Sequence, residues 1–79
     1  MVIAYILVTS REPPSCNSFN VRDRLLELDI VKEAHVLFGQ YDLIVKAEIS
    51  NLDDLKKLVF EDIRSNECVQ STTTLSVIP

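Results

Sequence analysis

The chain has 79 residues, which is enough for one small domain and too few for two. Its 47% hydrophobic and 25% charged residues are typical of a folded globular domain. Eight lysines and arginines against twelve aspartates and glutamates give a net charge of −4. Because the few cations are scattered along the sequence, we expect no direct nucleic-acid interface.

No segment of the sequence is suited to cross a membrane. The longest unbroken apolar run, Val2–Val8, has seven residues, whereas a membrane-spanning helix needs about 20. The run also lacks a preceding cationic segment and a following small-residue cleavage site, so it is a poor secretory signal. We therefore expect the protein in the cytoplasm, without a membrane partner.

The first predicted element is a strand over Val2–Val8. Its residues are apolar at both parities, which indicates a strand at the centre of a sheet that is covered on both faces. The segment Arg11–Ser18 contains two consecutive prolines and cannot continue the strand, so it is the one long loop. Asn17 or Ser18 then caps a helix that has apolar residues at helical spacing and ends near Leu28.

Two strand-like runs follow, over Val31–Phe38 and Tyr41–Ile49, with Gly39 and Gln40 between them. A glycine at the first central position is typical of a type II′ hairpin turn, because that position requires a positive φ. The second run alternates between two faces, one of which packs on helices. The sequence therefore predicts a tight two-residue hairpin.

A second helix and a fourth strand complete the chain. Asn51 caps a helix that runs to Arg64, with acidic residues in the first turn and the arginine in the last, as the helix dipole favours. The closing run, Val69–Ile78, is dense in β-branched residues and predicts a strand. The buried stripe of the second helix is expected to consist of Leu52, Leu55, Val59 and Ile63.

The predicted order βαββαβ indicates one α+β domain over residues 1–79, a ferredoxin-like sandwich with an antiparallel sheet of strand order 4-1-3-2. Both helices of such a fold lie on one side of the sheet, so the other side is bare in a monomer. That side is apolar whichever way the first strand is turned. It receives either Ile3, Tyr5 and Leu7 or the alternate set Val2, Ala4, Ile6 and Val8, with Ile44 beside them. We therefore expect a second subunit to cover it.

The two cysteines, Cys16 and Cys68, lie far apart in the sequence. Their spacing fits neither a C-x-x-C motif nor a dense disulfide scaffold. Because thiols stay reduced in the cytoplasm, we expect two free thiols. A disulfide remains geometrically conceivable, since both cysteines fall at the same end of the predicted sheet.

Catalytic, metal and cofactor sites have little support in the sequence. His35 stands alone without a neighbouring nucleophile, and a solvated strand histidine is the favoured interpretation. No spacing of histidine, cysteine or aspartate matches a metal site. A single glycine, Gly39, cannot form a phosphate-cradling loop. We predict no catalytic residue, no metal and no cofactor.

A polar cluster is expected at the end of the sheet where the hairpin turns. Tyr41 and Asp42 follow the turn, and Thr72, Thr73 and Thr74 lie near the start of the last strand, at the same end. One carboxylate and several hydroxyls suit a zwitterion, because the carboxylate pairs with an ammonium group while hydroxyls and backbone N–H groups bind a carboxylate. A structural interpretation competes, in which Asp42 caps the backbone after a turn and the threonines are strand formers.

Three motifs, in this order, give the chain its resemblance to a known family. They are a G-x-Y-D turn, a helix that opens L-x-x-L and a final strand with V-x-x-T-x-T. Over nearly its whole length the chain closely resembles the effector-binding (RAM) domain of the Lrp/AsnC, or feast/famine, transcriptional regulators. The motif residues are Gly39, Tyr41 and Asp42, then Leu52 and Leu55, then Val69, Thr72 and Thr74.

The resemblance implies a domain that dimerises through its sheet face, assembles further into octamers or related rings, and binds small amino acids between dimers near the turn. It also implies ligand-binding roles for Gly39, Tyr41, Asp42, Thr72 and Thr74. Two departures from the family pattern stand out. Residues 1–79 contain no helix-turn-helix, which the regulators carry at their N-terminus, and the loop Arg11–Ser18 is longer than the family's usual first connection.

We predict a non-enzymatic module for amino-acid sensing and oligomerisation that modulates transcription or metabolism through its partners. One alternative is an interaction module that co-assembles with full-length Lrp/AsnC regulators. Another is a small ferredoxin-like dimeric enzyme, such as a monooxygenase or isomerase, in which only Tyr5, His35 and Asp42 offer an acid or base. The sequence leaves the identity of the amino acid and the size of the ring open.

Overall fold

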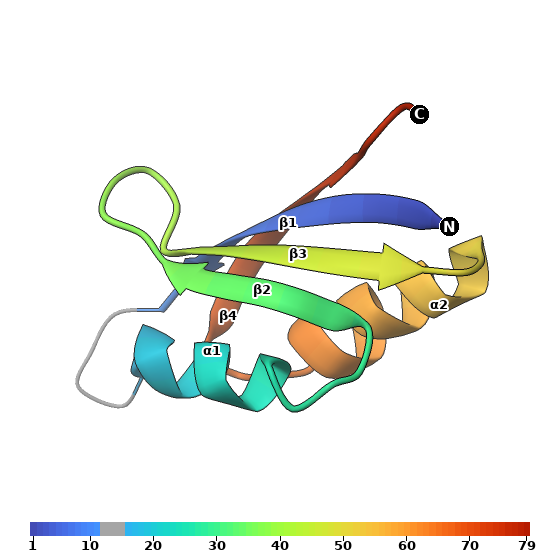
Figure 1. The fold of residues 1–79 in the computed structure, drawn as a ribbon. Coiled ribbons are helices and arrows are strands. Elements are labelled where there is room, and N and C mark those ends of the chain that lie inside the picture. Colours follow the sequence, from blue (N-terminus) through green and yellow to red (C-terminus); the bar gives the residue numbers. More distant parts are fainter. Residues whose placement is uncertain (12–15) are drawn as a thin grey trace.

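The computed structural model describes residues 1–11 and 16–79. They form one antiparallel sheet of four strands with the helices packed on one side (Figure 1). In chain order the elements are β1 (Val2–Ser10), α1 (Ser18–Leu25), β2 (Val31–Val36), β3 (Leu43–Ile49), α2 (Leu52–Lys57), the π-helix η1 (Leu58–Ile63) and β4 (Val69–Ser76).

The strand order is β2-β3-β1-β4, which is the predicted order read from the other edge. β1 is central and pairs antiparallel with both β3 and β4. The residues of β1 that are fully buried under the helices are Ala4, Ile6 and Val8. Because successive residues of a strand point to opposite faces, the bare side receives Ile3, Tyr5 and Leu7. The predicted ferredoxin-like βαββαβ sandwich is confirmed.

Both predicted helix N-caps are present. The side chain of Asn17 accepts a hydrogen bond from the Phe19 N–H at 2.8 Å, and that of Asn51 accepts one from the Asp54 N–H at 3.0 Å. Each bond satisfies an amide at the helix start that has no partner within the helix. The first helix ends at Leu25, before the predicted end near Leu28.

The second helix continues from α2 into η1, and its buried residues differ in part from the predicted stripe. Leu55, Val59 and Ile63 are buried as predicted, and Leu58 is fully buried with them. The wider turn of the π-helix brings Leu58 and Ile63, five residues apart, onto the core face. Leu52 is the first residue of α2 and is 64% exposed, and the start of α2 lies beyond the end of β3 (Figure 1). The prediction that Leu52 is buried was wrong.

The hairpin between β2 and β3 is wider than predicted. Both strands are shorter than expected, and the Leu37 N–H donates to the Asp42 carbonyl at 2.8 Å, closing a four-residue loop. Phe38 is fully exposed, so a longer strand would have nothing to pack against. Asp42 is bonded to β1 instead, through its N–H and the Val8 carbonyl at 2.9 Å. The type II′ assignment was therefore wrong, because contacts with β1 set the width of the loop.

Gly39 does have the positive φ that the sequence predicted, at +150°. A β-branched side chain resists this conformation although no atom obstructs a Cβ there. We expect Gly39→Val to lower the free energy of unfolding by more than about 1 kcal/mol, measured by urea denaturation. Gln40→Val is the matched control, because no described residue other than Gly39 has a positive φ. Equal midpoints for the two variants would contradict the prediction.

Both chain termini lie at one end of the sheet, and the β2–β3 loop lies at the other (Figure 1). The Val77 N–H donates to the Ile3 carbonyl at 2.8 Å, which keeps the chain after β4 beside the start of β1. The candidate site residues of the loop are therefore remote from both termini.

Candidate functional site

Asp42 lies at the end of β1 and is held there by its side chain as well as its backbone. The β1–β3 ladder ends at the pair Val8–Leu43. Beyond it, Oδ2 of Asp42 accepts the Ser10 N–H at 2.6 Å, so the carboxylate replaces the next residue of a pairing strand. Oδ1 makes no hydrogen bond to any described residue. Asp42 thus caps β1 and keeps one oxygen available for another partner.

The other two residues of the G-x-Y-D motif lie in the same loop. Tyr41 precedes Asp42 and is half-buried, whereas Gly39 is exposed at the tip. These three residues are brought together at one end of the sheet, as the sequence predicted.

Thr72 and Thr74 lie on β4, on the far side of β1 from Asp42. Thr72 pairs with Val8, and Thr74 pairs with Ile6. Directly paired residues share a face, so both threonines point to the helix side, where Thr72 is half-buried and Thr74 exposed. Since β1 lies between β3 and β4, the backbones that carry Asp42 and the threonines are about 9.5 Å apart.

A single copy of the chain therefore does not gather all five predicted residues around one amino acid. An α-amino acid carries its ammonium and carboxylate groups on one carbon, and cannot bridge Asp42 to Thr72 across an intervening strand. The ligand-binding role of these residues stays a prediction. It requires that the carboxylate and the threonines come from different copies of the chain.

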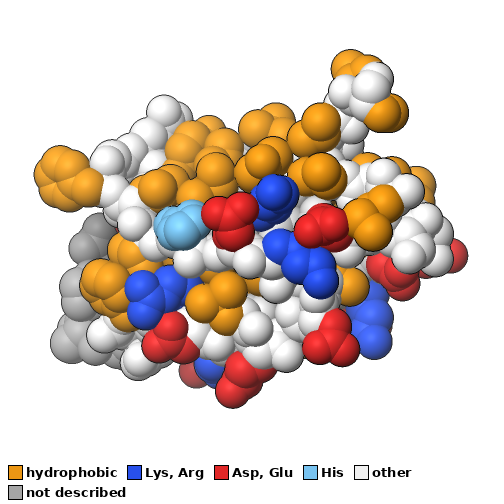
Figure 2. Space-filling model, in the orientation of Figure 1, with side chains coloured by type: hydrophobic (Ala, Val, Ile, Leu, Met, Phe, Trp, Pro, Cys, Tyr) orange, Lys and Arg blue, Asp and Glu red, His pale blue; other side chains and the backbone are white. Residues whose placement is uncertain are grey.

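The bare side of the sheet is apolar in its centre and charged along β2. Hydrophobic side chains gather on this side in Figure 2, and Leu75 of β4, which pairs with Tyr5, is 51% exposed. On the β2 side, Oε1 of Glu33 lies 3.2 Å from Nε2 of His35, and Oε2 of Glu33 lies 3.5 Å from Nζ of Lys46. The hydrogen bond from His35, and then the Lys46 charge, lower the pKa of Glu33. His35 is exposed, in line with the predicted solvated histidine.

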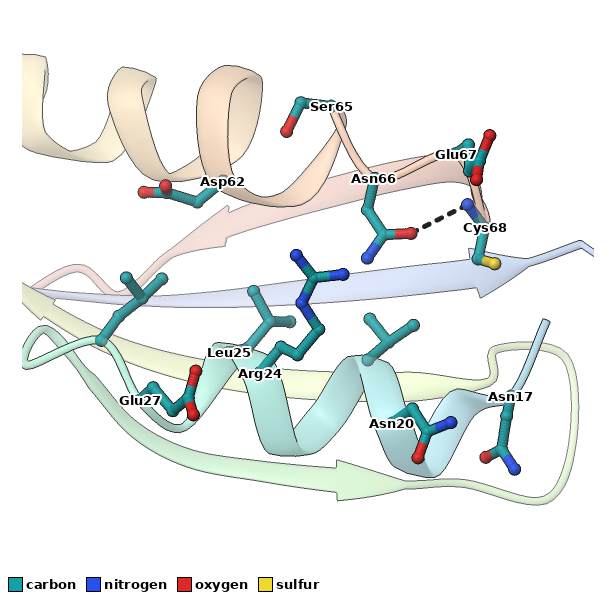
Figure 3. A pocket seen from close by; sticks show the side chains of 12 residues that line it. Asn17, Asn20, Arg24, Leu25, Glu27, Asp62, Ser65, Asn66, Glu67 and Cys68 are labelled. Carbon is teal, nitrogen blue, oxygen red and sulfur yellow. Dashed lines mark hydrogen bonds between the residues drawn. The ribbon is translucent and has the colours of Figure 1, made fainter.

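An open groove of about 610 Å³ separates α1 from the segment after η1 (Figure 3). Arg24 extends into it, with Asp62 and Asn66 on the opposite wall, and Cys68 at one end. None of the five predicted ligand-binding residues lines it. The sequence did not reveal this groove, because the polar residues that line it have the spacing of ordinary solvent-exposed helix faces.

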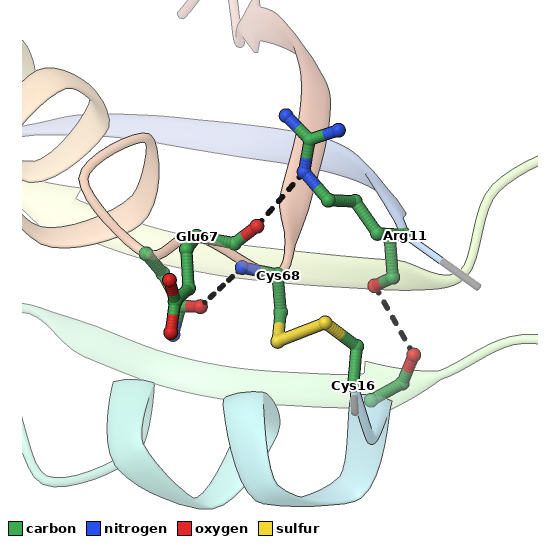
Figure 4. The surroundings of a disulfide bond; sticks show 7 residues. Arg11, Cys16, Glu67 and Cys68 are labelled. Atoms are coloured by element: carbon green, nitrogen blue, oxygen red, sulfur yellow. Dashed lines mark hydrogen bonds between the residues drawn. A yellow bond between two sulfur atoms is a disulfide. The ribbon is translucent and has the colours of Figure 1, made fainter. Parts of the chain in front are cut away.

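Cys16 and Cys68 form a disulfide at the end of this groove (Figure 4), with Cα atoms 5.3 Å apart. The expectation of two free thiols was wrong. It relied on the redox state of a compartment, whereas the fold brings the start of α1 against the start of β4. Nearby, the Arg11 N–H donates to the Cys68 carbonyl at 2.8 Å, and Nε of Arg11 donates to the Glu67 carbonyl at 2.8 Å.

Within residues 1–11 and 16–79, no three histidine, cysteine, aspartate or glutamate side chains are placed to hold a metal ion. No helix in these two ranges is long and apolar enough to span a membrane.

The family model of the Lrp/AsnC ligand binding domain matches residues 3–78, which is almost the whole chain. The chain belongs to this family. The resemblance carried by the G-x-Y-D turn and the last strand is thereby confirmed. The matching curated proteins are HTH-type transcriptional regulators, so the family is one of transcriptional regulators and not of enzymes.

Solved structures and curated relatives agree with this assignment. The crystal structure of FFRP-DM1 has a TM-score of 0.86 and 40% identity, over 99% of this chain and 100% of that one. AsnC of E. coli has a TM-score of 0.85 and 26% identity, over 99% of this chain and 51% of AsnC. An uncharacterized HTH-type regulator of Pyrococcus abyssi is 25% identical over 72 residues, 91% of this chain and 48% of the regulator. The Lrp/AsnC domain described here thus spans about half the length of the curated relatives it matches.

Proposed function

We propose that this Lrp/AsnC domain senses a small amino acid, which it binds beside Asp42 in an assembly of several copies. The observation that carries the proposal is the half-buried carboxylate at the end of β1. One of its oxygens is fixed by the Ser10 N–H at 2.6 Å and the other is free of described partners. A fixed carboxylate attracts an ammonium group without first having to be ordered.

The rest of the amino acid would be held by groups around the loop. Tyr41 offers an aromatic wall beside Asp42, and Gly39 lets the loop turn. The α-carboxylate would accept hydrogen bonds from Thr72 or Thr74 of another copy, because those of the same copy lie across β1. Binding would then join two subunits and change how they associate.

A structural neighbour is consistent with an amino-acid ligand. The transcriptional regulator NMB0573 of Neisseria meningitidis was crystallised as an L-Met complex and has a TM-score of 0.80 at 18% identity. At that identity only the fold is shared, so the complex supports amino-acid binding by this architecture and leaves the ligand of this chain to experiment.

Assembly of the domain would begin at the bare side of the sheet. Covering Ile3, Tyr5, Leu7 and Ile44 with the same surface of a second copy would give a symmetric dimer. Dimers would associate further, into an octamer or another ring, around the amino-acid sites. We place the protein in the cytoplasm, where free amino acids report metabolic state, and expect it to contact DNA only through partners.

A thermal-shift screen against the twenty amino acids tests the proposal. A ligand at about 100 times its dissociation constant adds about 2.7 kcal/mol to stability, which corresponds to a melting temperature roughly 10 °C higher or more for a domain of this size. We expect at least one small amino acid to give such a shift, and its analogue without the amino group to give none. Equal shifts for both would remove the ammonium from the recognition mechanism.

Two substitutions at Asp42 separate its binding role from its capping role. Asp42→Asn keeps an oxygen that accepts the Ser10 N–H, so stability should stay near that of the unchanged protein. It loses the charge, so binding of the amino acid found in the screen should weaken roughly tenfold to a hundredfold, measured by calorimetry. Asp42→Ala should weaken binding equally and also cost about 1 to 3 kcal/mol of stability, because the Ser10 N–H loses its partner. Normal binding by Asp42→Asn would place the site elsewhere.

A second candidate function is co-assembly with full-length Lrp/AsnC regulators. It is favoured by the match between 91% of this chain and about half of the P. abyssi regulator. Mixed oligomers would contain fewer DNA-binding arms than the pure regulator. Native mass spectrometry of the domain mixed with a full-length relative from the same organism should then show masses of mixed composition, and purely homomeric masses would exclude this function.

A further inference from the structure

We propose that the Cys16–Cys68 disulfide is a reversible redox site that controls how firmly Asp42 is held. The site is distinct from the G-x-Y-D loop, and its chemical partner is a dithiol reductant that reaches it through the groove between α1 and the segment after η1. Its consequence for amino-acid binding rests on the proposed function, whereas its effect on Asp42 does not.

The disulfide is accessible to a reductant. Both cysteines are only partly buried, and Cys68 lines the open groove. A thiolate of the dithiol attacks the Cys68 sulfur, forming a mixed disulfide and releasing the Cys16 thiolate. The second thiol of the reductant then attacks the reductant sulfur that is bonded to Cys68 in the mixed disulfide. This step releases the Cys68 thiolate. Two electrons pass from the dithiol to the protein, and the reductant leaves as a disulfide.

Cys68 is linked to the end of β1 through Arg11. The backbone N–H of Arg11 donates to the Cys68 carbonyl, and its Nε donates to the neighbouring Glu67 carbonyl, both at 2.8 Å. Arg11 directly follows Ser10, whose N–H donates to Asp42 at 2.6 Å. The position of Cys68, directly before β4, therefore helps to fix the Ser10 N–H that holds the Asp42 side chain.

The segment that follows Cys16 contacts Ser10 through a side chain. Ser18 opens α1 two residues after Cys16, and its hydroxyl donates to the Ser10 hydroxyl at 3.1 Å. The β1–β4 register shifts between Thr9 and Ser10, so Ser10 lies where the regular ladder is already interrupted. Ser10 still pairs with Val69 after this shift, and contacts from the two cysteine-bearing segments add to that pairing. The disulfide locks these two segments together and so holds Ser10 from both sides.

Reduction removes the covalent link between the segments that flank Ser10. The hydrogen bond from the Ser10 N–H to the Asp42 carboxylate is then less populated, and the carboxylate loses its fixed orientation. An ammonium ligand must order a mobile side chain before it binds, which lowers its affinity. The oxidised domain is thus the form with the higher affinity.

Amide chemical shifts of the folded protein test the coupling without any ligand. The Ser10 amide proton, bonded to a carboxylate, should resonate far downfield in the oxidised protein, and Asp42→Ala gives its position when that bond is absent. Reduction with dithiothreitol should move the resonance more than half of the way to that position, and reoxidation should restore it. Leu55→Ala, which removes a core contact away from the disulfide, should leave the Ser10 resonance of the oxidised protein at its original position. An unmoved Ser10 resonance in the folded, reduced protein would overturn the proposal.

The effect on binding is tested by repeating the amino-acid thermal-shift screen on oxidised and reduced protein. We expect the amino acid that stabilises the oxidised form to bind the reduced form at least tenfold more weakly. Equal affinities together with a moved Ser10 resonance would overturn the regulatory part of the proposal. Absence of any shift in both forms would count against the proposed function, while the Ser10 resonance would still decide the coupling.

Discussion

Replacing both Cys16 and Cys68 by serine is expected to lower the free energy of unfolding by about 4 kcal/mol. The disulfide joins residues 52 positions apart, and in the chain-entropy model the cost of closing a loop of that length is removed from folding. This is a large share of the roughly 5 to 15 kcal/mol that stabilises a typical domain. Urea denaturation of the oxidised protein and the double variant, at equal protein concentration, measures the difference.

Treatment with dithiothreitol provides the control for this prediction. The reductant should lower the midpoint of the unchanged protein to that of the double variant and leave the variant unaffected. Thiol titration of the unfolded, unreduced protein should find no free thiol. Two titratable thiols would show that the cross-link does not form in solution.

A lysine at Leu7 is expected to abolish association of the domain. Leu7 lies on the bare side of β1, where it pairs with Ile44 and Thr73 on the two neighbouring strands. A face-to-face dimer would bury the new ammonium group without a counter-charge, which costs several kcal/mol for each copy. The dissociation constant should therefore rise roughly a hundredfold or more, and sedimentation velocity at micromolar concentration should show monomers.

Leu26→Lys is the matched control for Leu7→Lys. Leu26 is 43% exposed at the C-terminal end of α1, on the helix side of the sheet, where a cation also suits the helix dipole. This variant should keep the oligomeric state of the unchanged protein. If the unchanged protein itself sediments as a monomer, the bare side is not a self-association surface.

Local chemistry and topology account for the parts of the fold that were predicted correctly. Asn17 and Asn51 precede helices and cap them because a short amide side chain reaches the free N–H groups of the first turn. The strand order follows from right-handed crossovers in a βαββαβ chain. Both rules need only neighbouring residues or the order of elements, which the sequence contains.

The parts that were predicted wrongly depend on contacts between distant segments. The width of the β2–β3 loop is set by the bonds from Asp42 to Val8 and Ser10, more than thirty positions away. The Cys16–Cys68 disulfide needs the start of β4 beside the start of α1, and a spacing rule does not contain that proximity. In the candidate site, the G-x-Y-D residues were located correctly, but β1 separates Asp42 from Thr72 in one copy.

The position of the termini determines how a signal from the Asp42 end can reach anything attached to the chain. β1 has nine residues, so the loop and the termini are separated by about 30 Å of strand. A DNA-binding segment joined to the chain before Met1 would lie at the far end of the sheet from Asp42 and would not contact a bound amino acid. A ligand at Asp42 would therefore act on such a segment by changing which subunits stand next to each other, and so the spacing and angle between their DNA-binding arms.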